Sequence, residues 1–141
     1  TDLYYSSTTD NDLYPEMFLS RMPISSTTEL SNLINKIMTY EKYTMSNPAY
    51  LDETLLIAGW DSQWTPRVGK PTMQYANNYY FNAAHGITPH VFLTTGSGQT
   101  TCYNYINNVG FVNYTAHGDN TMWYDPQFTT SNVNSMTNND K

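Results

Sequence analysis

Apolar positions along the chain alternate between short runs and helical stripes. The runs predict strands at about 3–6, 54–59, 89–94 and 111–115, with a further candidate at 17–21. Stripes with helical spacing predict helices at about 27–44, 71–84, 100–107 and 130–137. Strands that alternate with helices favour an α/β fold with a mostly parallel sheet and helices on both faces. Without an internal repeat or a linker, we expect one domain, or part of one, over residues 1–141.

Two segments carry this interpretation. Ser26 followed three residues later by Glu29 fits a capping box at the start of the first long helix. Its apolar stripe is narrow, so we expect one face to pack and the other to face water. The run 54–59 lacks the alternation of a half-exposed strand, which indicates a strand buried on both faces of a parallel sheet.

Composition then removes several classes of function. The 141 residues include only 6 Lys and Arg and carry a net charge of -6, which argues against nucleic-acid binding. The longest apolar stretch, residues 55–60, is too short to span a membrane. The single cysteine excludes an internal disulfide and a cysteine metal cluster. Low charge with many Asn, Thr and Tyr favours a secreted protein.

Two polar side chains follow predicted parallel strands. Asp61 comes just after the strand at 54–59, and His117 just after the strand at 111–115. Ligands of open parallel sheets bind outside the carboxyl ends of the strands, so both should lie at one edge of the sheet. An Asp beside a His can fix its tautomer, as a general base requires. The alternative is that His117 is a structural hydrogen-bonding residue.

The other candidate groups are weaker. His85 and His90 stand at element boundaries and are interpreted as structural, and Cys102 as a small buried apolar group. The acidic loop with Asp10, Asp12 and Glu16 suits a hard cation, or is a solvated turn. The chain thus offers a candidate base and an acid to orient it, but no plausible nucleophile. If the protein is an enzyme, we expect part of its active site to lie outside this chain.

Four segments resemble the gingipains, a family of secreted bacterial cysteine peptidases with a caspase-like αβα sandwich. The segment 111–118, which contains His117, resembles the family's catalytic-histidine segment. The others match in family order and near family spacing, and the similarity is strongest to the lysine-specific branch. They are residues 10–17, 55–61 and 123–126 with 129–130.

The resemblance implies a role for each matching residue. His117 would be the general base, Asp61 would orient it, and the amide of Gly118 would serve the oxyanion hole. Thr115 and Trp64 would line the substrate cleft. Asp10, Asp12, Glu16 and the carbonyl of Tyr14 would bind a structural calcium ion, and Cys102 would be non-catalytic. Asn11 and the pair Asp119–Asn120 depart from the family pattern without removing a functional group.

The resemblance also implies a partner. In the family a strand that carries the nucleophilic cysteine follows the last helix, and this chain ends at Lys141. We therefore expect the histidine-bearing piece of a processed, secreted or cell-surface endopeptidase that cleaves proteins after Lys. A cysteine-bearing chain of the same precursor would complete it, with Lys141 as a processing site.

Two other functions remain open at this stage. A catalytically inactive, calcium-stabilised binding or adhesion module would use the many Tyr and Trp side chains as a ligand surface. A metal hydrolase would use His117 and Asp61 as ligands, although a third ligand at suitable spacing is missing.

Overall fold

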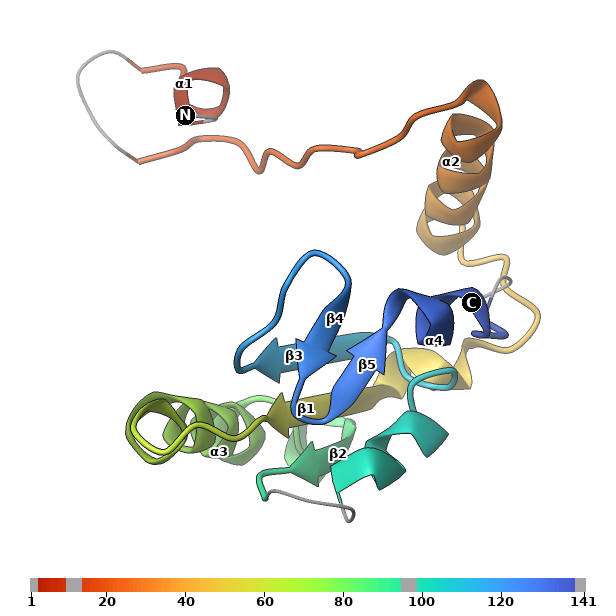
Figure 1. Cartoon of the computed structure of the whole chain (residues 1–141). Coiled ribbons are helices and arrows are strands. Elements are labelled where there is room, and N and C mark those ends of the chain that lie inside the picture. The colour runs from red at the N-terminus through yellow and green to blue at the C-terminus, as the bar shows by residue number, and fades with distance from the viewer. Residues whose placement is uncertain (1–2, 10–13, 95–98, 139–141) are drawn as a thin grey trace. The chain divides into compact units, whose positions relative to one another are not determined.

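The computed structural model describes residues 3–9, 14–94 and 99–138 (Figure 1). The chain divides into two units, residues 1–38 and 39–141. The first unit contains α1, a single turn at Leu3–Ser6, and most of α2, Thr27–Glu41. The second unit contains a parallel sheet and its covering elements.

The predicted strands at about 3–6 and 17–21 are wrong. Leu3–Ser6 is helical, and residues 17–21 form neither helix nor strand. A strand needs a neighbour to satisfy its backbone groups, and within the described residues neither segment joins a sheet. The contact between the two segments is a hydrogen bond from the Met17 amide to the Ser6 carbonyl, at 3.2 Å. Tyr4 and Tyr5 accordingly remain 81% and 66% exposed.

The long helix at 27–44 is confirmed as α2, which ends at Glu41. The hydroxyl of Ser26 accepts a hydrogen bond from the amide of Glu29 at 3.2 Å, as a capping residue does. The Glu29 carboxylate accepts its reciprocal bond from the amide of Ser25, at 2.6 Å, and not from Ser26. No residue of α2 is fully buried, and Leu30 and Leu33 of its apolar stripe are partly buried.

Three parallel strands form the central sheet, in the order β2-β1-β3. Their bounds are Glu53–Ala58 for β1, Thr88–Phe92 for β2 and Phe111–Thr115 for β3. In register, Leu55 of β1 lies between His90 and Val112. The predicted strands at 54–59, 89–94 and 111–115 are therefore confirmed, with shifts at the ends of the first two.

The middle strand is buried on both faces, as its unbroken apolar run predicts. Leu55 and Ile57 pack on one face against Cys102 and Phe128. Leu56 and Ala58 pack on the other face, against Met73 of α3. Helix α3, Lys70–Tyr79, thus covers one face, and η4, Gln99–Asn104, covers the other (Figure 1).

Several helices are shorter than predicted. The helix expected at 71–84 divides into α3 and the 3₁₀ turn η3, Ala83–His85, which Gly86 ends with a φ of 74°. The helix expected at 100–107 is the 3₁₀ segment η4, and the one at 130–137 is α4, Thr130–Asn134. Two further short helices are η1, Pro48–Asp52, and η2, Thr65–Gly69.

A small antiparallel hairpin lies between β3 and the last helix, where the sequence analysis predicts neither strand nor helix. It pairs β4, Met122–Tyr124, with β5, Gln127–Thr129, around a cis peptide bond between Asp125 and Pro126. Trp123 stacks on Tyr114 of β3 with ring centroids 4.4 Å apart, and Phe128 is buried in the core. The hairpin therefore closes the same face of the sheet as η4.

Candidate functional site

Asp61 and His117 meet at the carboxyl ends of β1 and β3. The last residues of these strands, Ala58 and Thr115, are register partners. The chain continues from them to Asp61 and His117, whose Oδ2 and Nε2 atoms are 2.9 Å apart. The expectation that topology would bring these two side chains to one edge of the sheet is confirmed.

The Asp61 carboxylate is oriented by its own turn. Its Oδ1 atom accepts hydrogen bonds from the amides of Gln63, at 2.8 Å, and Trp64, at 2.6 Å. The Trp64 amide, followed by the hydrogen bond with His117, lowers the pKa of Asp61 below its ordinary value. Asp61 is therefore an anion at neutral pH, with Oδ2 aimed at His117.

Thr65 also holds that turn in place, and the sequence analysis did not identify it as a site residue. Its buried hydroxyl donates to the carbonyl of Gly59 at 2.5 Å and accepts from the amide of Asp61 at 2.6 Å. A Thr directly before Pro66 is a helix-start signal that could have drawn attention to it. The hydroxyl ties the end of β1 to the residue that carries the carboxylate.

Asp125 of the hairpin holds the other side of the turn. Its Oδ2 atom accepts a hydrogen bond from the amide of Trp60 at 2.6 Å. The hairpin also approaches Gly59 so closely that a Cβ there would stand 2.5 Å from the Cβ of Ala116 and overlap the Asp125 carbonyl oxygen. Only glycine fits at this contact.

The backbone of His117 is fixed while its ring stays accessible. Its carbonyl accepts hydrogen bonds from the Tyr114 hydroxyl at 2.7 Å and from the Tyr124 amide at 3.0 Å. The side chain is 59% exposed. Among the described residues, Nε2 has Asp61 as its partner and Nδ1 has none. A carboxylate on Nε2 favours the tautomer in which Nδ1 keeps its lone pair.

Gly118 follows in a tight loop that Asp119 stabilises. The Asp119 carboxylate accepts from the Thr121 and Met122 amides, at 2.6 and 3.0 Å, and the Thr121 amide is the main cause of its lowered pKa. Gly118 forms a bridge with Trp123. Within the described part of the chain, the Gly118 amide donates to no acceptor, so it is free to face a ligand.

The two expected cleft residues flank this pair of side chains. Trp64 stands on the turn that holds Asp61, and its side chain is 57% exposed. Thr115 ends β3, and its carbonyl accepts from the Gly59 amide at 3.2 Å. Neither side chain hydrogen-bonds to Asp61 or His117 in the described structure.

Cys102 lies away from this chemistry. It is fully buried in the core beside Leu55 and Ile57. Burial raises the pKa of its thiol to about 11, so the thiolate needed for nucleophilic attack does not form at neutral pH. The prediction that Cys102 is a buried apolar group is confirmed.

The expected calcium ligands are only partly described. Asp10 and Asp12 lie outside the described residues. Tyr14 is 80% exposed, and the Glu16 carboxylate accepts hydrogen bonds from the amide and hydroxyl of Thr8 at 2.7 and 3.3 Å. The Thr8 amide lowers the pKa of Glu16. Within the described ranges, no three His, Cys, Asp or Glu side chains gather as a metal site.

Comparisons with known proteins agree on one family. The chain matches the profile of peptidase family C25 over residues 1–141. It is 49% identical over 142 residues to Lys-gingipain of Porphyromonas gingivalis, a match that covers 100% of this chain and 8% of that protein. Gingipain R2 of the same organism is 25% identical over 153 residues, covering 100% and 20%.

A solved structure supports the fold. It is described as "Structure of Protease", is 48% identical and has a TM-score of 0.86, covering 100% of this chain and 31% of that one. This confirms the α/β fold class. The chain spans a small part of the length of the relatives that it matches. Among the helices of the described residues, none is both long and apolar enough to cross a membrane.

Proposed function

Because the chain belongs to peptidase family C25, we propose that it is the histidine-bearing part of a cysteine endopeptidase that cleaves proteins after Lys. The observation that carries this proposal is the 2.9 Å hydrogen bond between His117 Nε2 and Asp61 Oδ2 at the carboxyl edge of the sheet. The preference for Lys rests on the 49% identity to Lys-gingipain, against 25% to Gingipain R2.

The nucleophile in this proposal is a cysteine of the same precursor, outside this chain. With Asp61 on Nε2, the lone pair on Nδ1 of His117 takes the proton of that thiol. The thiolate attacks the peptide carbonyl, and the Nδ1 proton then passes to the leaving amine as the acyl-enzyme forms. Water, deprotonated by the same nitrogen, releases the acyl group and restores the thiol.

Two further roles complete the mechanism. The Gly118 amide donates to the carbonyl oxygen as it becomes an oxyanion, a contribution of about 10²–10³-fold in rate for one such donor. The Trp64 and Thr115 side chains line the cleft on the two strand-end turns. Asp61 holds the imidazole and stabilises its charged form without itself transferring a proton.

A calcium ion is part of the proposal as a structural element. Carboxylates and a backbone carbonyl are the ligands that Ca²⁺ prefers. Glu16 fits that donor set, because the hydrogen bonds from Thr8 to its Oε2 atom help to hold the carboxylate in the charged form. Asp10, Asp12 and the carbonyl of Tyr14 would supply the other ligands. The ion would order the loop and takes no part in the chemistry.

The deciding experiment uses the complete precursor and a peptide substrate with a single Lys. Replacing His117 with Ala should reduce kcat by about 10⁴-fold or more with little change in thermal stability, because the ring is exposed. Asp52→Asn, on an exposed carboxylate before β1, is the control and should keep full activity. Most of the activity surviving in the His117→Ala protein would show that His117 is not the general base and would contradict the proposal.

A further inference from the structure

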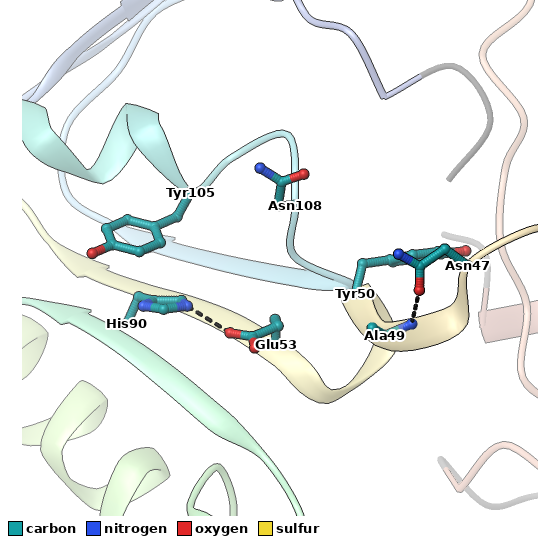
Figure 2. Close-up of a pocket in the computed structure, with 7 residues that line it drawn as sticks. All are labelled: Asn47, Ala49, Tyr50, Glu53, His90, Tyr105 and Asn108. Carbon is teal, nitrogen blue, oxygen red and sulfur yellow. Dashed lines mark hydrogen bonds and ion pairs between the residues drawn. The ribbon is translucent and has the colours of Figure 1, made fainter.

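A pocket of about 280 Å³ lies at the opposite edge of the sheet, where β1 and β3 begin (Figure 2). Its wall comes from η1, the start of β1, β2 and the segment after η4. The residues that line it are Asn47, Ala49, Tyr50, Glu53, His90 and Tyr105, with Asn108. None of them belongs to the site around His117.

The floor of the pocket is a fixed carboxylate–imidazole pair. Glu53 Oε2 and His90 Nε2 are 2.6 Å apart, and the side chains are 32% and 21% exposed. The His90 ring stacks on Tyr105 with centroids 3.8 Å apart. Because one Glu53 oxygen is occupied by His90, the pair leaves Oε1 without a partner among the described residues.

The opposite wall is also held in place. Asn47 caps η1 by accepting a hydrogen bond from the Ala49 amide at 3.0 Å. This cap fixes the turn that carries Tyr50, whose ring lies across the pocket from Tyr105 in Figure 2. The pocket therefore has a preformed shape with aromatic rings on two sides.

The charged residues that line the pocket favour a cationic ligand over an anionic one. Neither Lys nor Arg lines the pocket, and Glu53 is its one carboxylate. An anion would be repelled by Glu53, whereas a cation gains Oε1 and the neighbourhood of the Tyr50 ring, one face of the Tyr105 ring being already stacked on His90. The volume falls just below the range of about 300–1,000 Å³ that is usual for ligand sites, which suits a ligand the size of one side chain.

We propose that this pocket binds a primary alkylammonium group with a stem of about four carbons, the size of a lysine side chain. The ammonium donates to Oε1 of Glu53, and the alkyl stem packs between Tyr50 and Tyr105. One atom of Glu53 thus holds His90 and the other holds the ligand.

Calorimetric titration of the complete protein with n-butylammonium chloride tests this site. The wild-type protein should bind with a dissociation constant on the order of 1 mM, and the uncharged analogue 1-butanol should not bind measurably. Glu53→Gln should weaken binding by about tenfold or more, because it removes the charge that pairs with the ammonium. Asp52→Asn removes the same charge one residue away, outside the pocket, and should bind like the wild type.

Peptidase activity separates this result from the catalytic proposal. Glu53→Gln should retain it, because Glu53 lies at the far ends of the strands from His117. If that variant does not fold, Tyr50→Leu keeps the Glu53–His90 pair and should bind n-butylammonium several-fold more weakly. Equal binding by the wild type and the folded Glu53→Gln protein, equal binding of 1-butanol, or no binding by the wild type would overturn the proposal.

Discussion

The two carboxylate oxygens of Asp61 have different hydrogen-bond partners. Oδ1 accepts from two backbone amides, so it must be an acceptor atom, and Oδ2 faces Nε2 of His117. The turn thus sets the tautomer of a ring more than fifty residues away in the sequence. The lone pair on Nδ1 follows from the position of the amides of Gln63 and Trp64.

Because the two oxygens have different partners, we expect Asp61→Asn to reduce kcat strongly. The amides of Gln63 and Trp64 would keep the carbonyl oxygen of the new side chain, so its NH₂ group would face Nε2. The imidazole would then carry its proton on Nδ1 and could no longer accept one there. We expect kcat to fall by about 10²–10⁴-fold with KM little changed, measured on a peptide with a single Lys.

The same loss in an Asp52→Asn control would show that charge alone matters. A full retention of kcat in the Asp61→Asn protein would contradict the tautomer argument, since the geometry would then be irrelevant to proton transfer.

Gly59 is the position where the hairpin meets the end of β1. Gly59→Ala should destabilise the protein by about 1–3 kcal/mol, because the Asp125 carbonyl and the Ala116 side chain leave no space for a methyl group. Thermal denaturation followed by circular dichroism measures this effect.

Gly69→Ala is the matched control. Gly69 is also buried, has helical backbone angles and offers contacts no closer than 3.5 Å to a new methyl group. That substitution should be neutral or stabilising by up to about 1 kcal/mol. Equal destabilisation by both substitutions would show that Gly59 is not special.

Among the elements, those with a strong pattern could be predicted. β1 was recognisable because a continuous apolar run is what burial on two faces demands, and its position in the sheet then brought Asp61 and His117 together. The details of the site could not be predicted. Thr65 and Asp125 hold the turn after β1 through hydrogen bonds to the backbone of Gly59 and Trp60. The pattern of apolar and polar residues carries no information about such bonds.

The elements with a weak pattern were missed or assigned wrongly. Strands as short as β4 and β5 have too few residues for alternation to register in the sequence. The aromatic segment 3–6 has the composition of a strand, yet within the described structure it has no strand partner. It forms a single helical turn instead, so its backbone hydrogen bonds are local.

The acidic loop that contains Asp10, Asp12 and Glu16 is expected to be stabilised by calcium. Removal of calcium by a chelator should lower the melting temperature of the complete protein, because an ion that binds only the folded loop stabilises it, by about 2.7 kcal/mol at a hundredfold excess over its dissociation constant. Asp12→Ala should abolish this response. Equal melting temperatures of the parent protein with and without calcium would reject the site.

For the molecule as a whole, acid sensitivity follows from several exposed carboxylates. Backbone amides lower the pKa of Glu16, Glu29, Asp61 and Asp119. A carboxyl group with a lowered folded pKa stabilises the fold above its unfolded pKa, ordinarily 3.8 for Asp and 4.5 for Glu. That contribution is lost as the pH falls through the lower folded value.

Melting temperatures measured from neutral pH downward should therefore stay level to about pH 5 and fall below it. Asp119→Asn should flatten part of the fall, because the substituted side chain no longer takes up a proton on unfolding. A melting temperature that rises on acidification would show that repulsion within the net charge of -6 outweighs these hydrogen bonds.

The parallel order β2-β1-β3 also has a consequence during synthesis on the ribosome. β1 emerges first, and both of its hydrogen-bonding partners, residues 88–92 and 111–115, emerge later. Pairing between distant segments is slow, and an unpaired apolar strand is prone to aggregate. Among the strands of the described sheet, the most buried one thus waits longest for its partners in the nascent chain, where a chaperone that binds extended apolar peptides would find its site.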